Sequence, residues 1–442
     1  MGTILGKERL PFAAALYLML VVLPMTFSAG PIQMMTLVRV PLILLIIPLS
    51  LRLFMGAYGK VLLTDVLFFL HFFWFTLALA INNPQQVVTN AGATGIEFLG
   101  GYVLGRACIR NRATFVAMIR LLAFICLCLL PFVIYEALTG NAMLLRMLNS
   151  LPVVNSLPDI NAEKRMGLFR VQSAFAHPIH SGLFFIVIFS LCFLGLKDVY
   201  STTRRWTISA ICALCCFLAL SSGALLALFL QLGLITWALI FQNVKARWRL
   251  LLALFAVLYV LIAMLSNRPP IMVFLSYATF SSHTAYWRSL IFEYGMQNVW
   301  ANPWFGLGLR DWVRPFWMYS GSADNFWLLT AMRYGIPGFL FLAVGYLWAL
   351  WKIGTRDFDA DPVLWNLRRA WMFSFIGLTF TLCTVHIWHT IFSFVFFMFG
   401  AGMWFLQAQP ERPDEKAVAD TPSTHRRGPQ YTRFPATKTR AI

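Results

Sequence analysis

The sequence predicts an all-α polytopic membrane protein with about 12 transmembrane helices. Of its 442 residues, 60% are hydrophobic and only 12% are charged. The apolar residues gather in runs of about 17 to 25, each long enough to cross a bilayer core of about 30 Å as a helix. Runs of this length are not the short alternating segments of a membrane β-barrel. The composition therefore excludes a soluble protein.

The expected helices follow one another along nearly the whole chain. The first follows basic residues, but no small-x-small cleavage site stands out, so it is expected to be a retained helix rather than a signal peptide. The fourth is diluted by polar residues and glycines, and proline inside other runs predicts kinks. The expected ranges are 12–28, 36–51, 61–81, 91–108, 115–138, 181–196, 207–221, 224–242, 250–266, 324–352, 370–386 and 390–406.

Orientation follows from the basic residues. Of the 35 lysines and arginines, 24 fall on one side of these helices and nine on the other. The positive-inside rule makes the richer side cytoplasmic, together with both termini. Membrane topology thus explains how the basic residues behind the net charge of +18 are distributed, and we expect no nucleic-acid partner. We expect a transmembrane domain over 1–409, with outer loops at about 139–180 and 267–322, and a disordered cytoplasmic tail over 410–442.

The first outer loop ends in GLFRVQSAFAHPIHSG, residues 167–182. Guanidinium groups form forked hydrogen bonds to phosphate oxygens, so Arg165 and Arg170 are candidate ligands for a membrane-anchored phosphate. The alternative is contact with lipid headgroups. His177 precedes a proline and His180 is expected to begin the next helix; either can act as a base, or pack against or cap the helix start.

The second outer loop holds an apolar pattern of helical spacing from Ala285 to Val299. Such a helix is expected to lie along the outer membrane surface, with Arg288 on its polar side. The segment NPWFGLG then predicts a tight turn, and its glycines do not fit a dinucleotide fingerprint. Arg310 and Arg314 follow. The sequence does not decide whether they bind phosphate or contact lipid headgroups.

Asp324 stands at the outer mouth of the next helix, in DNFWLLTAMRYGIPG, residues 324–338. Aspartate caps helix N-termini well, which is one interpretation. It can also accept a proton from an incoming hydroxyl if burial raises its pKa.

Four motifs in this order resemble the bacterial O-antigen ligase and Wzy-type polysaccharide polymerase superfamily of membrane GT-C-like glycosyltransferases. They are Arg170 before its HP stretch, SSGA at 221–224, WRSLIFEYG…NPWFGLG, and DNFWLL…RYGIPG. The resemblance covers about residues 165–352. The chain departs from the family where many members have Ser-Arg-Gly and this chain has Ser222-Gly223.

The resemblance implies glycosyl transfer on the periplasmic face of the bacterial inner membrane, from a sugar linked through pyrophosphate to a polyprenyl lipid. Arg288 and Arg170 match the family arginines. Ligases commonly have His-Asn where this chain has Asp324-Asn325, which favours a polymerase over transfer to lipid A core. The implied partners are lipid-linked oligosaccharide donor and acceptor, membrane lipid and a chain-length regulator.

The residue chemistry fits this reaction. A polyprenyl pyrophosphate is already a good leaving group, so the enzyme needs positive charge and a base. Arginines can replace a metal, and the main outer loops contain no paired carboxylates. We expect catalytic roles for Arg288, Asp324 and His177, with no metal and no cofactor. The arginines expected to bind pyrophosphate are Arg165, Arg170, Arg288, Arg310 and Arg314.

A flippase for lipid-linked sugars is the alternative of a different class. It predicts internal repeats and ionisable residues near the bilayer centre. No convincing repeat is present, and only Asp65, His71 and Glu97 lie well inside the expected helices. Two further histidines near the outer end of the eleventh helix, His386 and His389, lack a third metal ligand and are expected to be interfacial.

Overall fold

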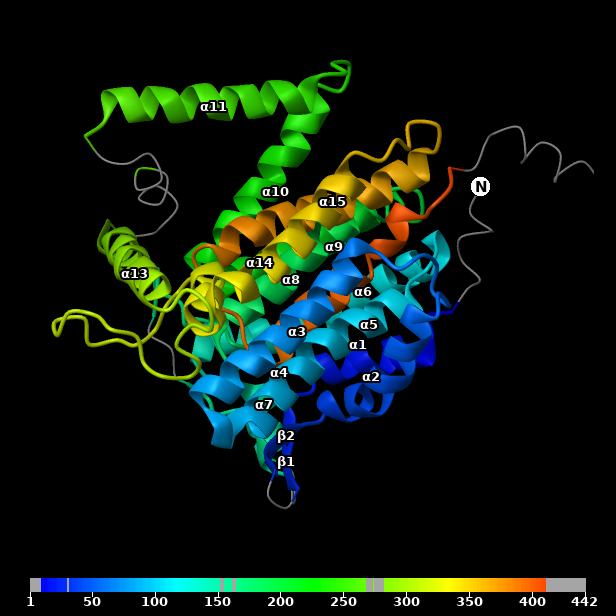
Figure 1. Cartoon of the computed structure of the whole chain (residues 1–442). Helices are drawn as coiled ribbons and strands as arrows, with labels where there is room; N and C mark the ends of the chain where they lie inside the picture. Colours follow the sequence, from blue (N-terminus) through cyan, green and yellow to red (C-terminus); the bar gives the residue numbers. More distant parts are fainter. Residues whose placement is uncertain are drawn as a thin grey trace, which may run out of the picture.

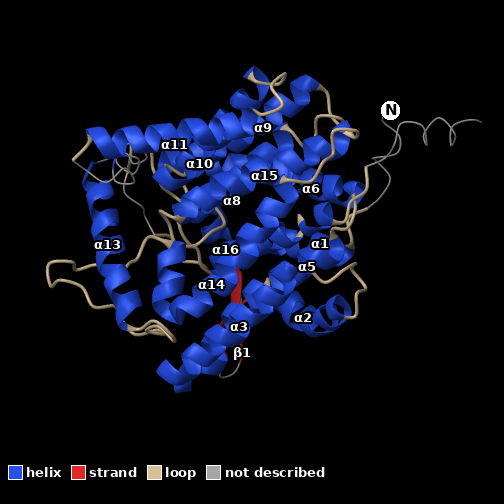
Figure 2. Cartoon of the chain, turned by 45° about the horizontal axis from the view of Figure 1, so that its top comes forward, coloured by secondary structure: helices blue, strands red, loops and turns tan. Residues whose placement is uncertain are grey.

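A computed structural model describes residues 9–29, 32–151, 155–160, 164–267, 273 and 282–410. The chain forms a bundle of long helices with a small sheet at one end (Figures 1 and 2). The mainly helical fold class is confirmed. Nearly all of the expected tail lies outside the described residues.

Helices occur within all twelve expected ranges. The first half of the chain contains α1 Phe12–Val21, α2 Arg39–Phe54, α3 Leu63–Asn82, α4 Gly92–Gly95, α5 Gly101–Cys108, α6 Arg112–Thr139, α7 Met143–Asn149 and α8 Pro178–Phe193. The second half contains α9 Thr202–Leu218, α10 Ser222–Ile240, α11 Arg247–Leu265, α13 Ser282–Ala301, α14 Phe326–Gly354, α15 Pro362–Leu382 and α16 His389–Gly400.

Six helical segments among the described residues are long and apolar enough to cross a membrane, half the number that the sequence predicts. Several of the others are too short: the 10 residues of α1 extend about 15 Å. The fourth expected span is broken into α4, α5 and two π-helical turns, Val87–Ala91 and Ile96–Gly100. The six are α3, α6, α10, α11, α14 and the segment His389–Leu406.

A three-stranded antiparallel sheet is the main departure from the predicted all-α fold. Strands β1 Met25–Ala29 and β2 Ile32–Thr36 form a hairpin, and β3 Asn155–Ser156 pairs with the other edge of β1. The first expected helix therefore ends at Val21, shortly before Pro24, whose ring cannot continue a helix. The sheet ties the N-terminal region to the segment between α7 and α8.

The three ionisable residues that the sequence places well inside expected helices, Asp65, His71 and Glu97, each have a polar partner. Glu97 accepts from Arg39 at 2.8 Å, and the His71 Nδ1 lies 2.7 Å from the carbonyl of Gly338. Asp65 accepts hydrogen bonds from the hydroxyl of Tyr102 and the backbone of Leu62. Each of these groups thus holds two segments of the bundle together.

Helix α14 is broken at Gly335, whose φ of +73° and ψ of 177° are not helical. The turn at residues 302–308 docks on this break: Leu307 N–H donates to the Met332 carbonyl at 2.7 Å, and Gly308 N–H to that of Arg333 at 2.9 Å. These donors satisfy carbonyls that the broken helix leaves open. The kink expected near Pro337 is confirmed, and the NPWFGLG turn stabilises it.

Candidate active site

A cavity of about 900 Å³ lies where the ends of several helices meet. Its wall combines the loop before α8, the α9–α10 junction, α13, the start of α14 and the α15–α16 connection. The charged and imidazole side chains that line it are Arg165, Arg170, Arg288, Arg333, Asp324, His177 and His386. The structure thus brings together five of the seven residues proposed from the sequence.

The loop that carries Arg165 and Arg170 is held by a buried carboxylate. Glu136, near the end of α6, accepts from the backbone N–H of Gln172 at 2.7 Å and of Ser173 at 3.0 Å. Because a carboxylate bonded to two backbone donors fixes the chain locally, Glu136 positions the segment beside Arg170. The sequence analysis did not single out this residue.

Backbone strain marks the same part of the wall. Leu220 has a φ of +45° and Met166 a φ of +52°, and both line the cavity. The Leu220 carbonyl accepts from a guanidinium nitrogen of Arg165 at 3.0 Å. Positive φ at non-glycine residues is costly and is found where the surrounding structure imposes it, often at functional sites.

His177 caps α8, so the helix-capping interpretation is confirmed. Its Nδ1 accepts from the backbone N–H of Ile179 at 3.1 Å. Burial and the nearby charge of Arg170 lower the pKa of His177 to about 4, so the ring is neutral at pH 7. In a neutral ring whose Nδ1 accepts, the proton resides on Nε2. His177 is therefore a hydrogen-bond donor with no free basic nitrogen.

Arg288 extends from α13 into the cavity wall. The expected helix is confirmed, but its polar and apolar residues are not separated on opposite faces. Its apolar side chains, including Trp287 and Leu290, pack against α14 and the 307–318 segment. The Arg288 Nε is buried and has no hydrogen-bond partner. Burial lowers the pKa of Arg288, and Asp324 opposes this shift. A buried guanidinium nitrogen without an acceptor is suited to an anionic ligand.

Asp324 does not cap α14, so the capping interpretation of this residue is wrong. Asn325 is the cap, and its Oδ1 accepts from the backbone N–H of Leu328 at 3.0 Å. Asp324 instead accepts from the hydroxyl of Ser322 at 2.7 Å and lines the cavity. Its carboxylate is therefore available to a hydroxyl in the cavity.

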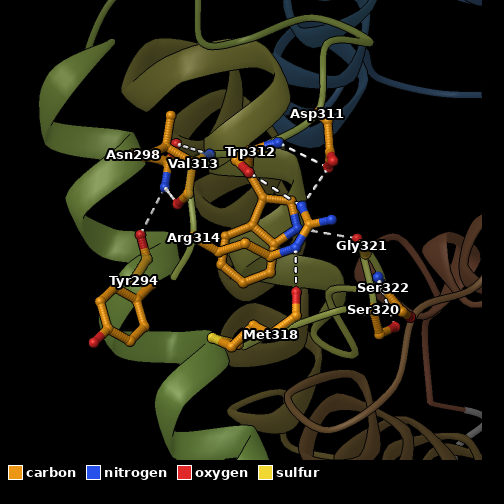
Figure 3. A network of polar contacts seen from close by, with 10 residues as sticks. All are labelled: Tyr294, Asn298, Asp311, Trp312, Val313, Arg314, Met318, Ser320, Gly321 and Ser322. Atoms are coloured by element: carbon orange, nitrogen blue, oxygen red, sulfur yellow. Dashed lines mark hydrogen bonds and ion pairs between the residues drawn. The ribbon is translucent and has the colours of Figure 1, made fainter. Parts of the chain in front are cut away.

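Arg310 and Arg314 are not among the residues that line the cavity. Arg310 donates to the side chain of Asn82. Arg314 donates to Asp311 at 2.7 Å and to the Met318 carbonyl at 2.8 Å (Figure 3). The Arg310 bond joins the loop to α3, and the Arg314 bonds lie within the loop. The pyrophosphate role expected of both arginines is therefore without support from the geometry.

Two cavity residues were not predicted. Arg333 lies in α14 two residues before the break at Gly335, and no role was expected for it from the sequence. His386 has a buried Nδ1 without a hydrogen-bond partner, and burial and the charge of Arg333 lower its pKa to about 3. The motif RYGIPG could have indicated Arg333, because this arginine lies two residues before a glycine that breaks the helix. A broken helix redirects the side chains that precede the break.

The described residues contain no group of three or more His, Cys, Asp or Glu side chains that could hold a metal ion. A protein-family model described as O-Antigen ligase matches residues 207–343. This range includes Ser222, Arg288, Asp324 and Arg333 of the cavity wall. A search of curated proteins found no match.

Proposed function

Because residues 207–343 match the O-antigen ligase family, we propose that this integral membrane protein is a glycosyltransferase. It polymerises oligosaccharide repeat units linked to polyprenyl pyrophosphate into O-antigen, capsule or exopolysaccharide. The reaction takes place at the periplasmic face of the inner membrane. The cavity is its active site.

The observation that carries this proposal is four arginines and one carboxylate around a single cavity. A departing pyrophosphate gains negative charge, and guanidinium groups fixed before the reaction stabilise that charge. Arg165, Arg170, Arg288 and Arg333 are the proposed ligands. The N-termini of α8, α10 and α14 also meet at this cavity and add partial positive charge.

The proposed step is a direct displacement at the anomeric carbon. Asp324 accepts the proton of the acceptor hydroxyl, whose oxygen forms the new glycosidic bond. The bond from the anomeric carbon to the phosphate oxygen breaks, and its electron pair leaves with the polyprenyl pyrophosphate. His177 donates through Nε2 to an oxygen of the substrate. Attack opposite the leaving group inverts the anomeric configuration.

A ligase that transfers the polysaccharide to lipid A core is the second candidate, favoured by the match to the O-antigen ligase family. The presence of Asp324 where ligases commonly have histidine supports the polymerase. A flippase is less well supported, because Asp65, His71 and Glu97 each have partners that hold the bundle together.

Incubation of the purified protein with a polyprenyl-pyrophosphate oligosaccharide, with and without lipid A core, tests the proposal. Chain growth without core is the expected result. Transfer only to core identifies a ligase, and donor that crosses the bilayer unreacted identifies a flippase. Activity should persist when a chelator is added, because arginines take the place of a metal; loss of activity contradicts that part of the proposal.

A further inference from the structure

In α15, an arginine is buried without a counter-charge. Arg369, in α15, is 9% exposed. In the part of the chain that the structure describes, it has no hydrogen bond or ion pair, and its Nε is buried without a partner. Burial of an unpaired cation is costly. The site therefore favours an anion.

A second arginine lies over the same aromatic ring. The Arg369 Cζ is 4.0 Å from the ring centroid of Trp365, and the Arg247 Cζ is 5.7 Å from that centroid. Cation–π contacts orient guanidinium groups but do not neutralise them. The carboxylate that caps this helix, Asp361, pairs with Arg112 at 2.7 Å. Two cations thus share one indole with no carboxylate assigned to them.

The surroundings indicate the level of lipid headgroups. Arg247 begins α11, which is one of the candidate spans and has no buried residues. This helix stands apart from the bundle (Figure 1). The Trp237 indole donates to the Arg247 carbonyl at 3.0 Å, and Trp248 packs edge-on against Phe373 at 5.7 Å. Tryptophan gathers at membrane interfaces, and the count of basic residues assigns this side to the anionic cytoplasmic leaflet.

From these contacts we propose that Arg247 and Arg369 bind the phosphate of an anionic phospholipid, with Trp365 as the platform that holds both guanidinium groups. The acyl chains lie along the exposed apolar surface of α11, which favours a lipid over free phosphate. The site is separate from the proposed pyrophosphate cavity and does not depend on its function.

Native mass spectrometry of the full-length protein tests this site. Phosphatidylglycerol is the probe, phosphatidylethanolamine the zwitterionic comparison, and inorganic phosphate the competitor. We expect Arg369→Gln and Arg247→Gln each to weaken phosphatidylglycerol binding about tenfold, the loss of a charged hydrogen bond. Arg249→Gln is the matched control, because Arg249 is exposed in the first turn of the same helix; it should change binding less than twofold.

Three outcomes overturn the proposal. One is unchanged binding in both variants, and another is an equal loss in Arg249→Gln, which indicates unspecific charge attraction. The third is complete competition by millimolar inorganic phosphate, which identifies free phosphate as the ligand. Arg369→Lys guards against misfolding: it keeps the charge but loses the forked donor, so an intermediate affinity is expected. Full wild-type affinity in this variant would contradict the forked contact.

Removal of residues 411–442 distinguishes the lipid from the acidic side chains of the tail. If lipid occupies the site, the truncated protein binds phosphatidylglycerol as the full chain does. A tenfold gain in affinity on truncation would show that the tail, and not lipid, occupies these arginines in the full-length protein, which would overturn the assignment.

Discussion

Arg288 and Arg314 both lie in the segment between α11 and α14 but differ in what their guanidinium groups contact. Arg314 donates to Asp311, to the Met318 carbonyl and to the Trp312 carbonyl. Arg288 lines the cavity, and its Nε has no partner. The first arginine folds the loop, whereas the second retains donor capacity for a ligand. The roles of arginines in one segment therefore differ with the acceptors near each guanidinium group. The sequence alone does not show which acceptors these are.

The largest expected effect is that of Arg288→Lys. Lysine keeps the charge but loses the forked donor, so polymer should be abolished in cells, a loss of about 10²–10³-fold in rate. The protein should still accumulate in the membrane. Arg314→Lys is the matched control. Polymer length should be normal, while the free energy of unfolding falls by about 1 kcal/mol because hydrogen bonds are lost. Normal polymer in the Arg288 variant would refute its assigned role.

An effect of similar size is expected for Asp324→Asn, which keeps the shape of the side chain and removes its basicity. A general base contributes about 10²–10⁴-fold, and the rate of chain growth should fall within that range. Asp311→Asn should leave the rate unchanged, because Asp311 pairs with Arg314 outside the cavity. An Asp324→Asn variant with more than a tenth of the wild-type rate would exclude this residue as the base.

The docked turn can be tested through Gly335. A Cβ at this position would lie 2.1 Å from the Trp304 carbonyl oxygen, and its backbone conformation is almost exclusive to glycine. Gly335→Ala should destabilise the protein by about 3 kcal/mol and displace Arg333. Gly233→Ala is the control, since nothing lies within 4 Å of a Cβ there. Equal thermal stability of the two variants would contradict the proposed role of the kink.

Much of the helical arrangement could be predicted because long apolar runs leave the backbone no alternative to helix in lipid. Five candidate site residues were found because the count of basic residues predicts an arginine-poor outer side, on which these arginines are unusual. The capping of α14 was not predictable, because Asp324 and Asn325 are both good caps and only the backbone geometry selects between them.

Other features depended on contacts between segments distant in the sequence. The strand β1 pairs with residues about 130 positions away, and the partner of Arg310 is Asn82. Arg333 joins the cavity because a turn from another segment stabilises the break at Gly335. Local sequence patterns contain none of this information, because the residues around a position do not identify a contact partner that is distant in the chain.

The smallest effect is expected for His177→Asn. This variant distinguishes a role of His177 as hydrogen-bond donor from a role as catalytic base. Asparagine can cap α8 through Oδ1 and donate through Nδ2, so the rate of chain growth at pH 7 should stay within about threefold. A catalytic base would instead lose at least 10²-fold.

The pH dependence of stability provides a second reading of the same variant. The pKa of His177 is about 4 in the folded protein, below its ordinary value of about 6.5. The unfolded chain therefore binds the proton first, and the contribution of His177 to stability is complete above about pH 6.5 and lost as the pH falls towards 4. Thermal unfolding across this range should show a smaller loss in His177→Asn than in the wild type, with His386 responsible for much of the remainder. Identical curves would mean that the ring of His177 is solvated and that the hydrogen bond to Ile179 does not fix its tautomer.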